Sequence, residues 1–493
     1  MMHNGKVERE KDRKFDCKRW GLTVEAVSDL GKQLYEMWFR FQWCFRTKTG
    51  NTGEYAYKYL RGLLTMKDGR QYTNIAQKMI GWNNDGQNIQ HFMSDSPWKA
   101  ENVFNQIQAE IKGRNELAGG MLTLDESGDR CYGKGKAGAA RQYLGREGKV
   151  DLGQVGVGLG YYKKGAWALV NAGLYLPEIW FDEEHKKLWK GLHIPVDHKF
   201  MTKAEIGLKK IKEAKANKLP FEIVGCDSLY GRNKEFREEL DKEKMLYMAD
   251  IPEDTKVYLS PPVVGIPEDK EEKVGRPNTR YQLLNDVKSI EVMELTKNGK
   301  ISFQSIKVRD SERGDLNYKC AAYRVWTINE STVREEWVFI REEEDGDYSF
   351  SMSNASPETS LTQLAIWKSQ RYFVERIFED MKSEIGWDEL EARKYRAWMH
   401  LVAVSAMALW FIAEIKLDWA KKYPRDPELI HELEVNVLPL LSVANIREML
   451  QAVLPLKQFS VEESIGVVVN HLVNRSRSMR SRLKKQHGTQ KNR

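Results

Sequence analysis

The sequence predicts an α/β protein. A mixed β-sheet with flanking helices is interrupted by a β-rich insertion, and helical regions lie at both ends. Three observations support this prediction. Apolar residues recur at helical spacing over the first 118 residues. After Gly119-Gly120, the pattern changes to three strands, a helix, a strand, a helix and a strand. Helical spacing returns over residues 361–416 and continues to residue 473, with breaks at prolines.

This pattern divides the chain into six segments. The first contains TNIAQKMIGWNNDGQNIQHFM, whose two short helices could form a DNA-binding helix-turn-helix, although an ordinary helical hairpin fits equally well. The insertion opens with a proline-rich, charged linker, and we expect a separate β unit there with a hairpin at Thr-Lys-Asn-Gly. The expected segments are a helical DNA-binding domain (1–118), the first part of the sheet domain (119–252), the insertion (253–358), the second part of the sheet domain (359–418), a helical region (419–474) and a basic tail (475–493).

The composition excludes several classes of protein. Of the 493 residues, 41% are hydrophobic and 30% are charged, which is enough apolar material to exclude a wholly disordered chain. The five cysteines are far apart and form no CxxC pair, which excludes a disulfide framework and a cysteine zinc site. The N-terminus has no apolar stretch typical of a secretory signal, and the most apolar run, residues 401–412, is too short to span a bilayer. We therefore expect a cytoplasmic protein with no membrane partner.

The net charge of +7 is concentrated at one end of the chain. Eight basic residues and no acidic residue follow residue 474, so the tail carries +8 and the remainder about −1. A basic tail on a near-neutral body suits contact with nucleic acid phosphates, although a solubilising, disordered tail is the alternative. The candidate phosphate contacts are Arg475, Arg477, Arg480, Arg482, Lys484 and Lys485.

Two acidic residues end predicted apolar strands. Asp125 follows MLTL and Asp227 follows FEIVGC. An aspartate at the end of a buried strand is unfavourable unless it binds something, and sheet ends are where ligand sites lie in α/β proteins. Two such residues on neighbouring strands could hold Mg²⁺, which prefers oxygen ligands. The alternative is that each starts a turn or caps a helix.

A third carboxylate lies on the predicted helix QRYFVERIFEDMKSEIG. Relative to Arg371, Glu375 and Lys382 lie at about 40° and about 20° around the helix, so the three form one stripe. A solvated helix with interleaved charges would look similar. Three carboxylates from two strands and a helix can hold two metal ions about 4 Å apart, and Arg371 and Lys382 would then clamp the phosphates.

Three blocks of sequence resemble a known family. They are LDESGDRCYGKGKAGAARQYLGREGKVDLGQVGVGLGYY, then LYLPEIW with CDSLYGRNKEFREEL, then RYFVERIFEDMKSEIGWDELEARKYRAW. In this order, over roughly residues 35–415, they are similar to insertion-sequence transposases of the DDE superfamily endonuclease group. The resemblance implies a ribonuclease H-like fold in which Asp125, Asp227 and Glu375 bind two Mg²⁺ ions, with Mn²⁺ as a substitute.

The resemblance also implies a function. A DNA transposase of this group would bind the terminal inverted repeats of a mobile element, cleave its ends and join the 3′-hydroxyl ends to target DNA by cut and paste. It would act as a homodimer on double-stranded DNA, associated with the nucleoid. The alternatives are a ribonuclease H-like nuclease without strand transfer and a domesticated DNA-binding protein without catalysis.

The chain departs from the family pattern at two places. Related families have a Tyr-Arg-Glu-Lys signature, in which Arg371, Glu375 and Lys382 match but Lys368 replaces the tyrosine. A hairpin intermediate is implied only by this partial match. The second departure is Asp129-Arg130-Cys131-Tyr132, where members often have Phe-Pro-Lys-Lys. Glu126 follows Asp125, and because neighbours on a strand point to opposite faces, we expect only one of them, Asp125, to face the metal.

Other residues are weaker candidates. Lys134, Lys136 and Arg141 could grip the DNA backbone, or they could belong to a solvated loop. Trp326 and Trp337 could stack on an extruded base or pack in the core of the insertion. The motif GKGKAG lacks the spacing of a phosphate-binding loop, so no nucleotide cofactor is expected.

Overall fold

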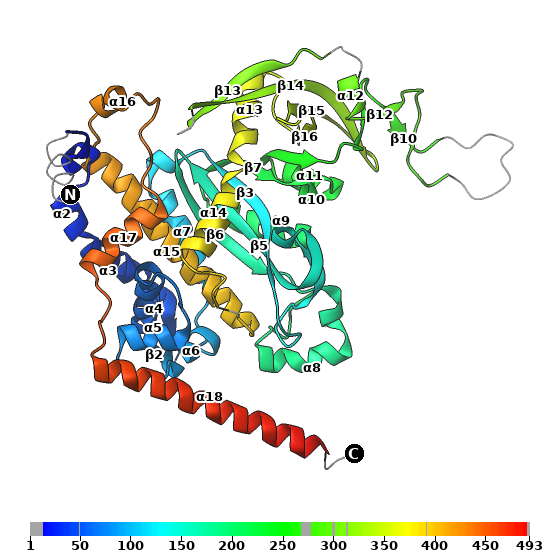
Figure 1. Ribbon diagram of the computed structural model, residues 1–493. Helices are drawn as coiled ribbons and strands as arrows, with labels where there is room; N and C mark the ends of the chain where they lie inside the picture. The colour runs from blue at the N-terminus through cyan, green and yellow to red at the C-terminus, as the bar shows by residue number, and fades with distance from the viewer. Residues whose placement is uncertain are drawn as a thin grey trace.

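A computed structural model gives the structure of most of the chain. The described residues are 13–48, 50–267, 278–297, 301–311, 314–390 and 392–490, and for 484–490 only the backbone is described. The mixed α/β architecture is the predicted one: a large mixed sheet with helices on both faces (Figure 1). This arrangement is consistent with a ribonuclease H-like fold.

The N-terminal region is almost entirely helical. Apolar residues at helical spacing form buried faces, as in α3, where Leu30, Leu34, Met37 and Phe41 are buried. The predicted helix-turn-helix stretch forms two short helices joined through Gly86, whose φ is 77°. The helices are α2 (Val24–Ser28), α3 (Leu30–Phe41), α4 (Gly53–Thr65), α5 (Tyr72–Met79), α6 (Gln87–Ser94) and α7 (Ala100–Lys112), and the one strand pair is β1 (Arg46–Thr47) with β2 (Gly50–Asn51).

The central part of the sheet follows the predicted order of strands. β3 (Gly120–Arg130) pairs antiparallel with β5 (Lys149–Lys163) and parallel with β7 (Phe221–Cys226). β5 also pairs with β4 (Ala140–Leu144) and β6 (Ala166–Leu174), and β7 pairs parallel with β8 (Leu246–Ile251). The connecting helices are α8 (Glu183–Leu192), α9 (Lys203–Ala216), α10 (Ser228–Gly231) and α11 (Lys234–Lys242).

The insertion is not the separate unit that we expected. Its last strand, β16 (Tyr348–Ser353), pairs antiparallel with β8, so the insertion extends the central sheet to twelve strands. The other main strands are β9 (Lys256–Tyr258), β12 (Ser289–Glu291), β13 (Gln304–Ser311), β14 (Gly314–Asn329) and β15 (Thr332–Glu342). The predicted hairpin at Thr-Lys-Asn-Gly is wrong, because β12 pairs with β9 and β13 pairs with β14. Between β12 and β13 the chain forms a short helix, α12 (Glu294–Lys297).

Glycines in β5 let helices pack closely on one face of the sheet. A Cβ atom at Gly158 would lie 2.7 Å from the ring of Phe378, and one at Gly160 would lie 2.6 Å from Ile377. Both partners belong to α14 (Phe373–Glu379), which crosses the sheet in Figure 1. The alternation of glycine in GQVGVGLG therefore reflects close helix packing.

The helical region that we expected over residues 361–416 is present, and it is divided into several helices. It consists of α13 (Leu361–Gln370), α14, a π-helical turn (Asp380–Glu384) and α15 (Tyr395–Lys422). Among the described residues, α15 is the one helix that is long and apolar enough to cross a membrane, but 94% of its most apolar window is buried. This burial is typical of a core helix, as predicted.

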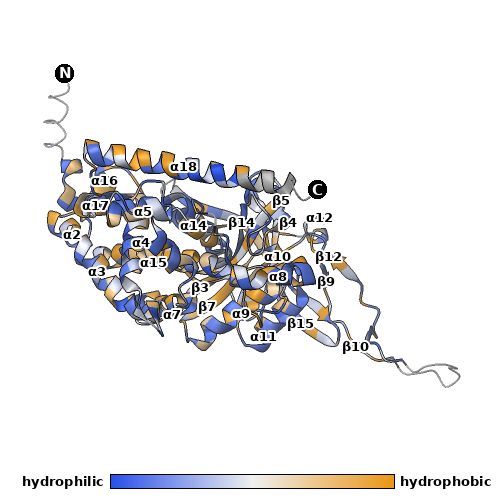
Figure 2. Cartoon of the chain, turned by 90° about the horizontal axis from the view of Figure 1, so that it is seen from below, coloured by the Kyte–Doolittle hydropathy of each residue, from blue (hydrophilic) through white to orange (hydrophobic). Residues whose placement is uncertain are grey.

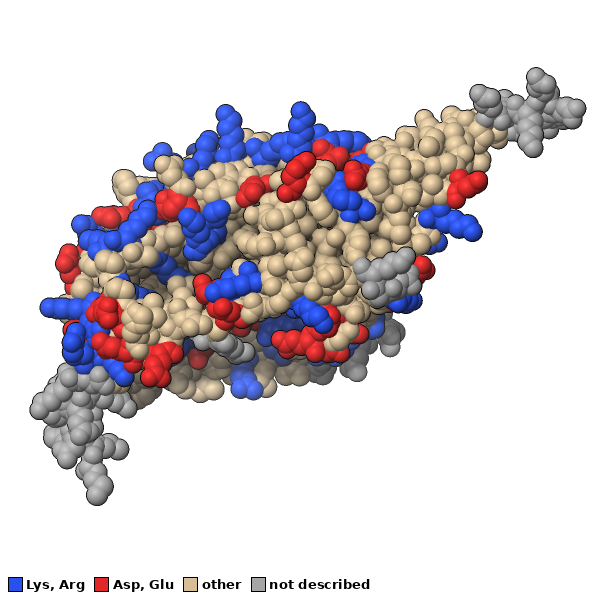
Figure 3. Space-filling model, turned by 90° about the horizontal axis from the view of Figure 1, so that it is seen from above, with Lys and Arg blue, Asp and Glu red and all other residues tan. Residues whose placement is uncertain are grey.

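Three helices follow α15: α16 (Glu428–Glu432), α17 (Val443–Val453) and α18 (Val461–Gln490). The start of the predicted basic tail, residues 475–490, is therefore helical in the structure. α18 lies along the edge of the molecule in two views, and apolar residues recur along it (Figures 1 and 2). On the face of the molecule shown in Figure 3, basic and acidic side chains are interspersed around a broad uncharged area.

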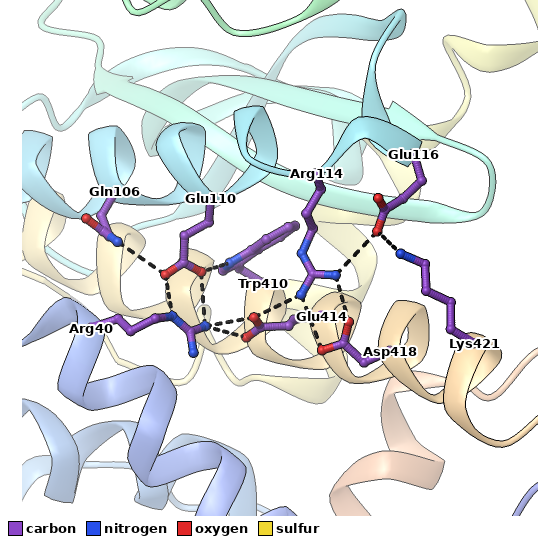
Figure 4. Close-up of polar contacts among 9 residues, drawn as sticks. All are labelled: Arg40, Gln106, Glu110, Arg114, Glu116, Trp410, Glu414, Asp418 and Lys421. Atoms are coloured by element: carbon purple, nitrogen blue, oxygen red, sulfur yellow. Dashed lines mark hydrogen bonds and ion pairs between the residues drawn. The ribbon is translucent and has the colours of Figure 1, made fainter.

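Ion pairs join the N-terminal helices to α15 (Figure 4). Arg40 of α3 binds Glu110 of α7 and Glu414 of α15, both at 2.7 Å. Arg114, just after α7, binds the same Glu414 at 3.0 Å and Asp418 at 2.7 Å. Glu414 is mostly buried and shared by two arginines, so this network fixes the N-terminal region against the core helix.

Candidate active site

The ends of two parallel strands bring three carboxylates together. The pairing of β3 with β7 ends at Leu124 opposite Cys226, so Asp125 and Asp227 emerge at the same edge of the sheet. One carboxylate oxygen from each of Asp125, Glu126 and Asp227 lies within 4.8 Å of the others. Asp227 also caps α10, because its side chain accepts a hydrogen bond from the Leu229 N–H at 3.0 Å.

The position of Glu126 differs from our expectation that only one of the two neighbours faces the site. Among the described residues, no strand pairs with β3 on the β7 side beyond Leu124. This leaves space for both Asp125 and Glu126 to reach Asp227. Glu126 also accepts a hydrogen bond from Lys203, at the start of α9, at 3.0 Å.

The electrostatics of this cluster are unfavourable without a cation. Burial raises the pKa of Asp125 to about 8, and the nearby charge of Asp227 adds to the shift. Burial also raises the pKa of Asp227 to about 6, with a further contribution from Glu126. The second carboxylate oxygen of Glu126 is buried and has no hydrogen-bond partner among the described residues. Clustered oxygen donors with this excess of negative charge fit a divalent cation such as Mg²⁺.

Glu375 lies next to this cluster but outside it. Its side chain is 51% exposed, and Arg371 Nη2 binds its carboxylate at 3.1 Å. Arg371 Nη1 lies 3.8 Å from Asp125 Oδ2. The structure therefore brings Asp125 and Asp227 together directly, and it connects Glu375 to them through Arg371.

Arg371 is held in place by Asp250, a residue that was not predicted from the sequence. Asp250 accepts hydrogen bonds from Lys368 at 2.5 Å and Ser351 at 2.7 Å, and Arg371 Nε lies 3.0 Å from its other oxygen. Burial alone would raise the pKa of Asp250, but Lys368 and Arg371 hold it below its usual range. Lys368, the departure from the family signature, thus forms a buried ion pair. Asp250 lies near the end of the apolar strand MLYMADI, so the signal that found Asp125 and Asp227 applies to it too.

Lys382 does not share the stripe of Arg371 and Glu375. It lies in the π-helical turn, and its Nζ binds Asp129 at 2.6 Å. The prediction assumed a regular helix with about 100° per residue from Arg371 to Lys382. In the structure, α13 ends at Gln370 and a π turn changes the rotation per residue after Glu379. As a phosphate contact, Lys382 would first have to leave Asp129.

The other predicted DNA contacts are dispersed. Lys134 is exposed and Lys136 is partly buried in the loop after β3, and Arg141 is exposed on β4. Trp326 is half-buried on β14, opposite Tyr258 of β9, and Trp337 packs against a small hydrophobic cluster that joins the insertion to β3, β7, β8 and α13. On α18, Arg475, Arg477, Arg480 and Arg482 are exposed, and the side chains of Lys484 and Lys485 lie outside the described residues. The DNA contacts of all these residues stay predictions.

Comparison with known proteins identifies the family of this chain. The family described as DDE superfamily endonuclease matches residues 40–315, more than half of the chain, including Asp125, Glu126, Asp227 and Asp250. A relative, the probable transposase for insertion sequence element IS701 of Microchaete diplosiphon, is 31% identical over 212 residues, which are 42% of this chain. The aligned part spans about half (51%) of that curated relative. The chain therefore belongs to the DDE superfamily endonuclease family, as its sequence predicted.

Proposed function

We propose that the protein is a metal-dependent DNA transposase. It would cut the phosphodiester at each end of a mobile element and join the 3′-hydroxyl ends to target DNA. The observation that carries this proposal is the group of three carboxylates within 4.8 Å at the ends of β3 and β7, in a chain of this family. The name of the IS701 relative adds support.

In this proposal, Asp125 and Asp227 hold the divalent cations, two Mg²⁺ ions or Mn²⁺ in their place. The cations would activate a water or the 3′-hydroxyl and stabilise the leaving oxygen of an in-line displacement. Glu375 completes the site when its carboxylate leaves Arg371. The freed guanidinium of Arg371 stays anchored by Asp250, where it can bind a DNA phosphate in the bidentate way that arginine favours.

DNA would be bound by several parts of the chain. The N-terminal helices, with the α5–α6 pair, would recognise the terminal inverted repeats. The loop with Lys134 and Lys136, the strand with Arg141 and the arginines of α18 would contact phosphates, and Trp326 would stack on a base. Two ends must be cut together, so a homodimer would act on the DNA.

A nuclease without strand transfer is the second candidate. It is favoured by one observation, namely that Lys368 replaces the tyrosine of the signature and is committed to Asp250. A domesticated DNA-binding protein is less well supported, because all three predicted carboxylates are present at or beside the cluster.

The test is cleavage of a DNA fragment that carries the repeats flanking the gene, with Mg²⁺ or with EDTA. We expect metal-dependent cuts at the repeat boundary by the wild type and none by Asp227→Asn. Asparagine is also a good helix cap, so this variant keeps the start of α10. The matched control, Asp286→Asn at an exposed position of the insertion, should cut normally.

A target plasmid in the same reaction separates the two candidates. Joined products would establish strand transfer, and cuts without joining would indicate the nuclease. DNA binding by the wild type without any metal-dependent cut would refute both.

A further inference from the structure

An apolar stripe runs along α18 and is covered by nothing in the described chain. Its residues are each between 52% and 72% exposed and fall within about 60° of one another around the helix. They follow one another at intervals of four, three, four, seven and four residues, which is close to the 3.5-residue repeat of a coiled-coil seam. The stripe consists of Val461, Ile465, Val468, Leu472, Met479 and Leu483, with Arg475 at the position between Leu472 and Met479, and two further exposed valines, Val469 and Val473, lie along one side of it.

The opposite side of α18 faces the body of the protein. Between residues 461 and 483, only Glu463, Gly466 and Val467 are partly buried, and all three lie on the side away from the stripe. A Cβ atom at Gly466 would lie 2.2 Å from the ring of Trp82, so α18 touches the N-terminal region there. The stripe therefore points away from its own chain, and its partner must come from outside.

We propose that α18 pairs in antiparallel orientation with α18 of a second copy of this chain. The near-heptad spacing of the stripe is typical of a coiled-coil seam, and Val469 and Val473 would lie beside that seam. In a pair with two-fold symmetry, the stripe of one copy packs against the same stripe of the other copy. Because each body lies behind its own helix, the two bodies would lie on opposite sides of the pair without obstructing it.

The charges along α18 select the antiparallel orientation. The helix begins with Glu462 and Glu463, and its second half carries arginines and no acidic residue. A parallel pair would place arginine beside arginine. In an antiparallel pair centred on residue 470, Val461 lies opposite Met479, Val468 opposite Leu472 and Ile465 opposite Arg475. Each acidic end lies beside the basic half of the other helix.

The pairing places two copies of the carboxylate cluster in one particle before DNA is present. It does not depend on the proposed reaction, because it rests on α18 alone. Arg477 and Arg480 lie on the side away from the seam, so pairing leaves them accessible.

The mass of the full chain in solution, without DNA, tests the proposal. Light scattering across a dilution series should give twice 57.3 kDa for the wild type. Leu472→Glu should halve this mass, while Asn470→Glu, the same charge change on the opposite face, should leave it unchanged. A wild type that stays at 57.3 kDa, or a Leu472→Glu variant that keeps the doubled mass, would overturn the proposal. Because position 472 is exposed, both variants should fold, which circular dichroism verifies.

Cross-linking tests the orientation. Cys17 is the exposed cysteine among five, so the background variant is Cys17→Ser. In that background, Val461→Cys and Met479→Cys proteins are mixed and treated with a mild oxidant. A disulfide between the two different variants is expected. Disulfides that link two chains of the same variant, with none between the two different variants, would mean a parallel pair and overturn the antiparallel arrangement.

Discussion

The replacement of Asp250 gives the sharpest test of how the site is held. The side chain of Asp250 is 16% exposed. It forms ion pairs with Lys368 and Arg371 and accepts a hydrogen bond from Ser351. Lys368 and Arg371 are themselves only 8% and 19% exposed. Asp250→Asn keeps the size of the side chain but removes the negative charge that both cations face. Lys368 would then lie poorly solvated without its anion, whereas Arg371 would keep Glu375 at 3.1 Å and Asp125 at 3.8 Å.

The expected magnitude follows from this burial. Removing one partner of a buried ion pair destabilises a protein by about 3–5 kcal/mol, because the remaining charge is left without compensation. We therefore expect Asp250→Asn to lower the free energy of unfolding by about 3–5 kcal/mol. Lys368→Met should cost less, because Arg371 still neutralises Asp250. The double variant should lose about 0.5–3 kcal/mol less stability than the sum of the two single losses, because both substitutions remove the same ion pair.

Urea unfolding of the four proteins at neutral pH measures these quantities. Since the pKa of Asp250 is lowered from 3.8, its contribution is fully present above about pH 4 and is lost as the pH falls through the lower, folded-state value. The difference between wild type and Asp250→Asn should accordingly shrink in acid. A loss below about 1 kcal/mol at neutral pH, the range of surface ion pairs, would refute the view that Asp250 is a buried anchor.

Three further predictions concern the third carboxylate, the metal and the arginines of α18. Glu375→Gln should abolish cleavage and leave repeat binding unchanged in a gel-shift assay, and a fully active variant would remove Glu375 from the site. Mg²⁺ should raise the unfolding temperature of the wild type but not of Asp125→Asn. This rise should be greater at pH 8 than at pH 6, because the pKa of Asp125 is raised to about 8 and protons compete with the metal below that pH. An equal rise at both pH values would contradict this account. Replacing Arg477 and Arg480 by Gln leaves the apolar stripe in place and should reduce the slope of log affinity against log salt by about 0.9 for each phosphate that the arginines neutralise. An unchanged slope would show that they bind no phosphate.

The parts of the site that the sequence could predict depend on local pattern. An apolar run that ends in aspartate marks a strand end, and β3 and β7 are parallel neighbours, so Asp125 and Asp227 meet. The proximity of Glu126 could not be predicted in this way, because it depends on where β7 stops beside β3. The sequence indicates where each strand ends. It does not indicate how far two strands that are distant in the sequence extend beside each other.

The errors arose where long-range pairing or irregular geometry decides the outcome. The local turn signal at Thr-Lys-Asn-Gly did not decide the pairing, because β12 pairs over three residues with β9 and β13 pairs over seven residues with β14. Lys382 was misplaced because a π turn has no clear sequence signal and shifts every later residue around the helix. Asp250 had the same strand-end signal as the other aspartates, but its partners come from β16 and α13, more than 100 residues away.

The insertion helps to position the site, because the chain leaves the central sheet at β8 and returns beside it as β16. Ser351 lies opposite Asp250 in this pairing and donates a hydrogen bond to it. α13 begins a few residues later and carries Lys368 to the same carboxylate, and Arg371 follows directly after the helix. The register of β16 on β8 therefore sets where Arg371, and with it Glu375, stands relative to Asp125. If the insertion were shortened, the site should survive only where β16 and its pairing with β8 are kept, whatever happens to the strands farther out.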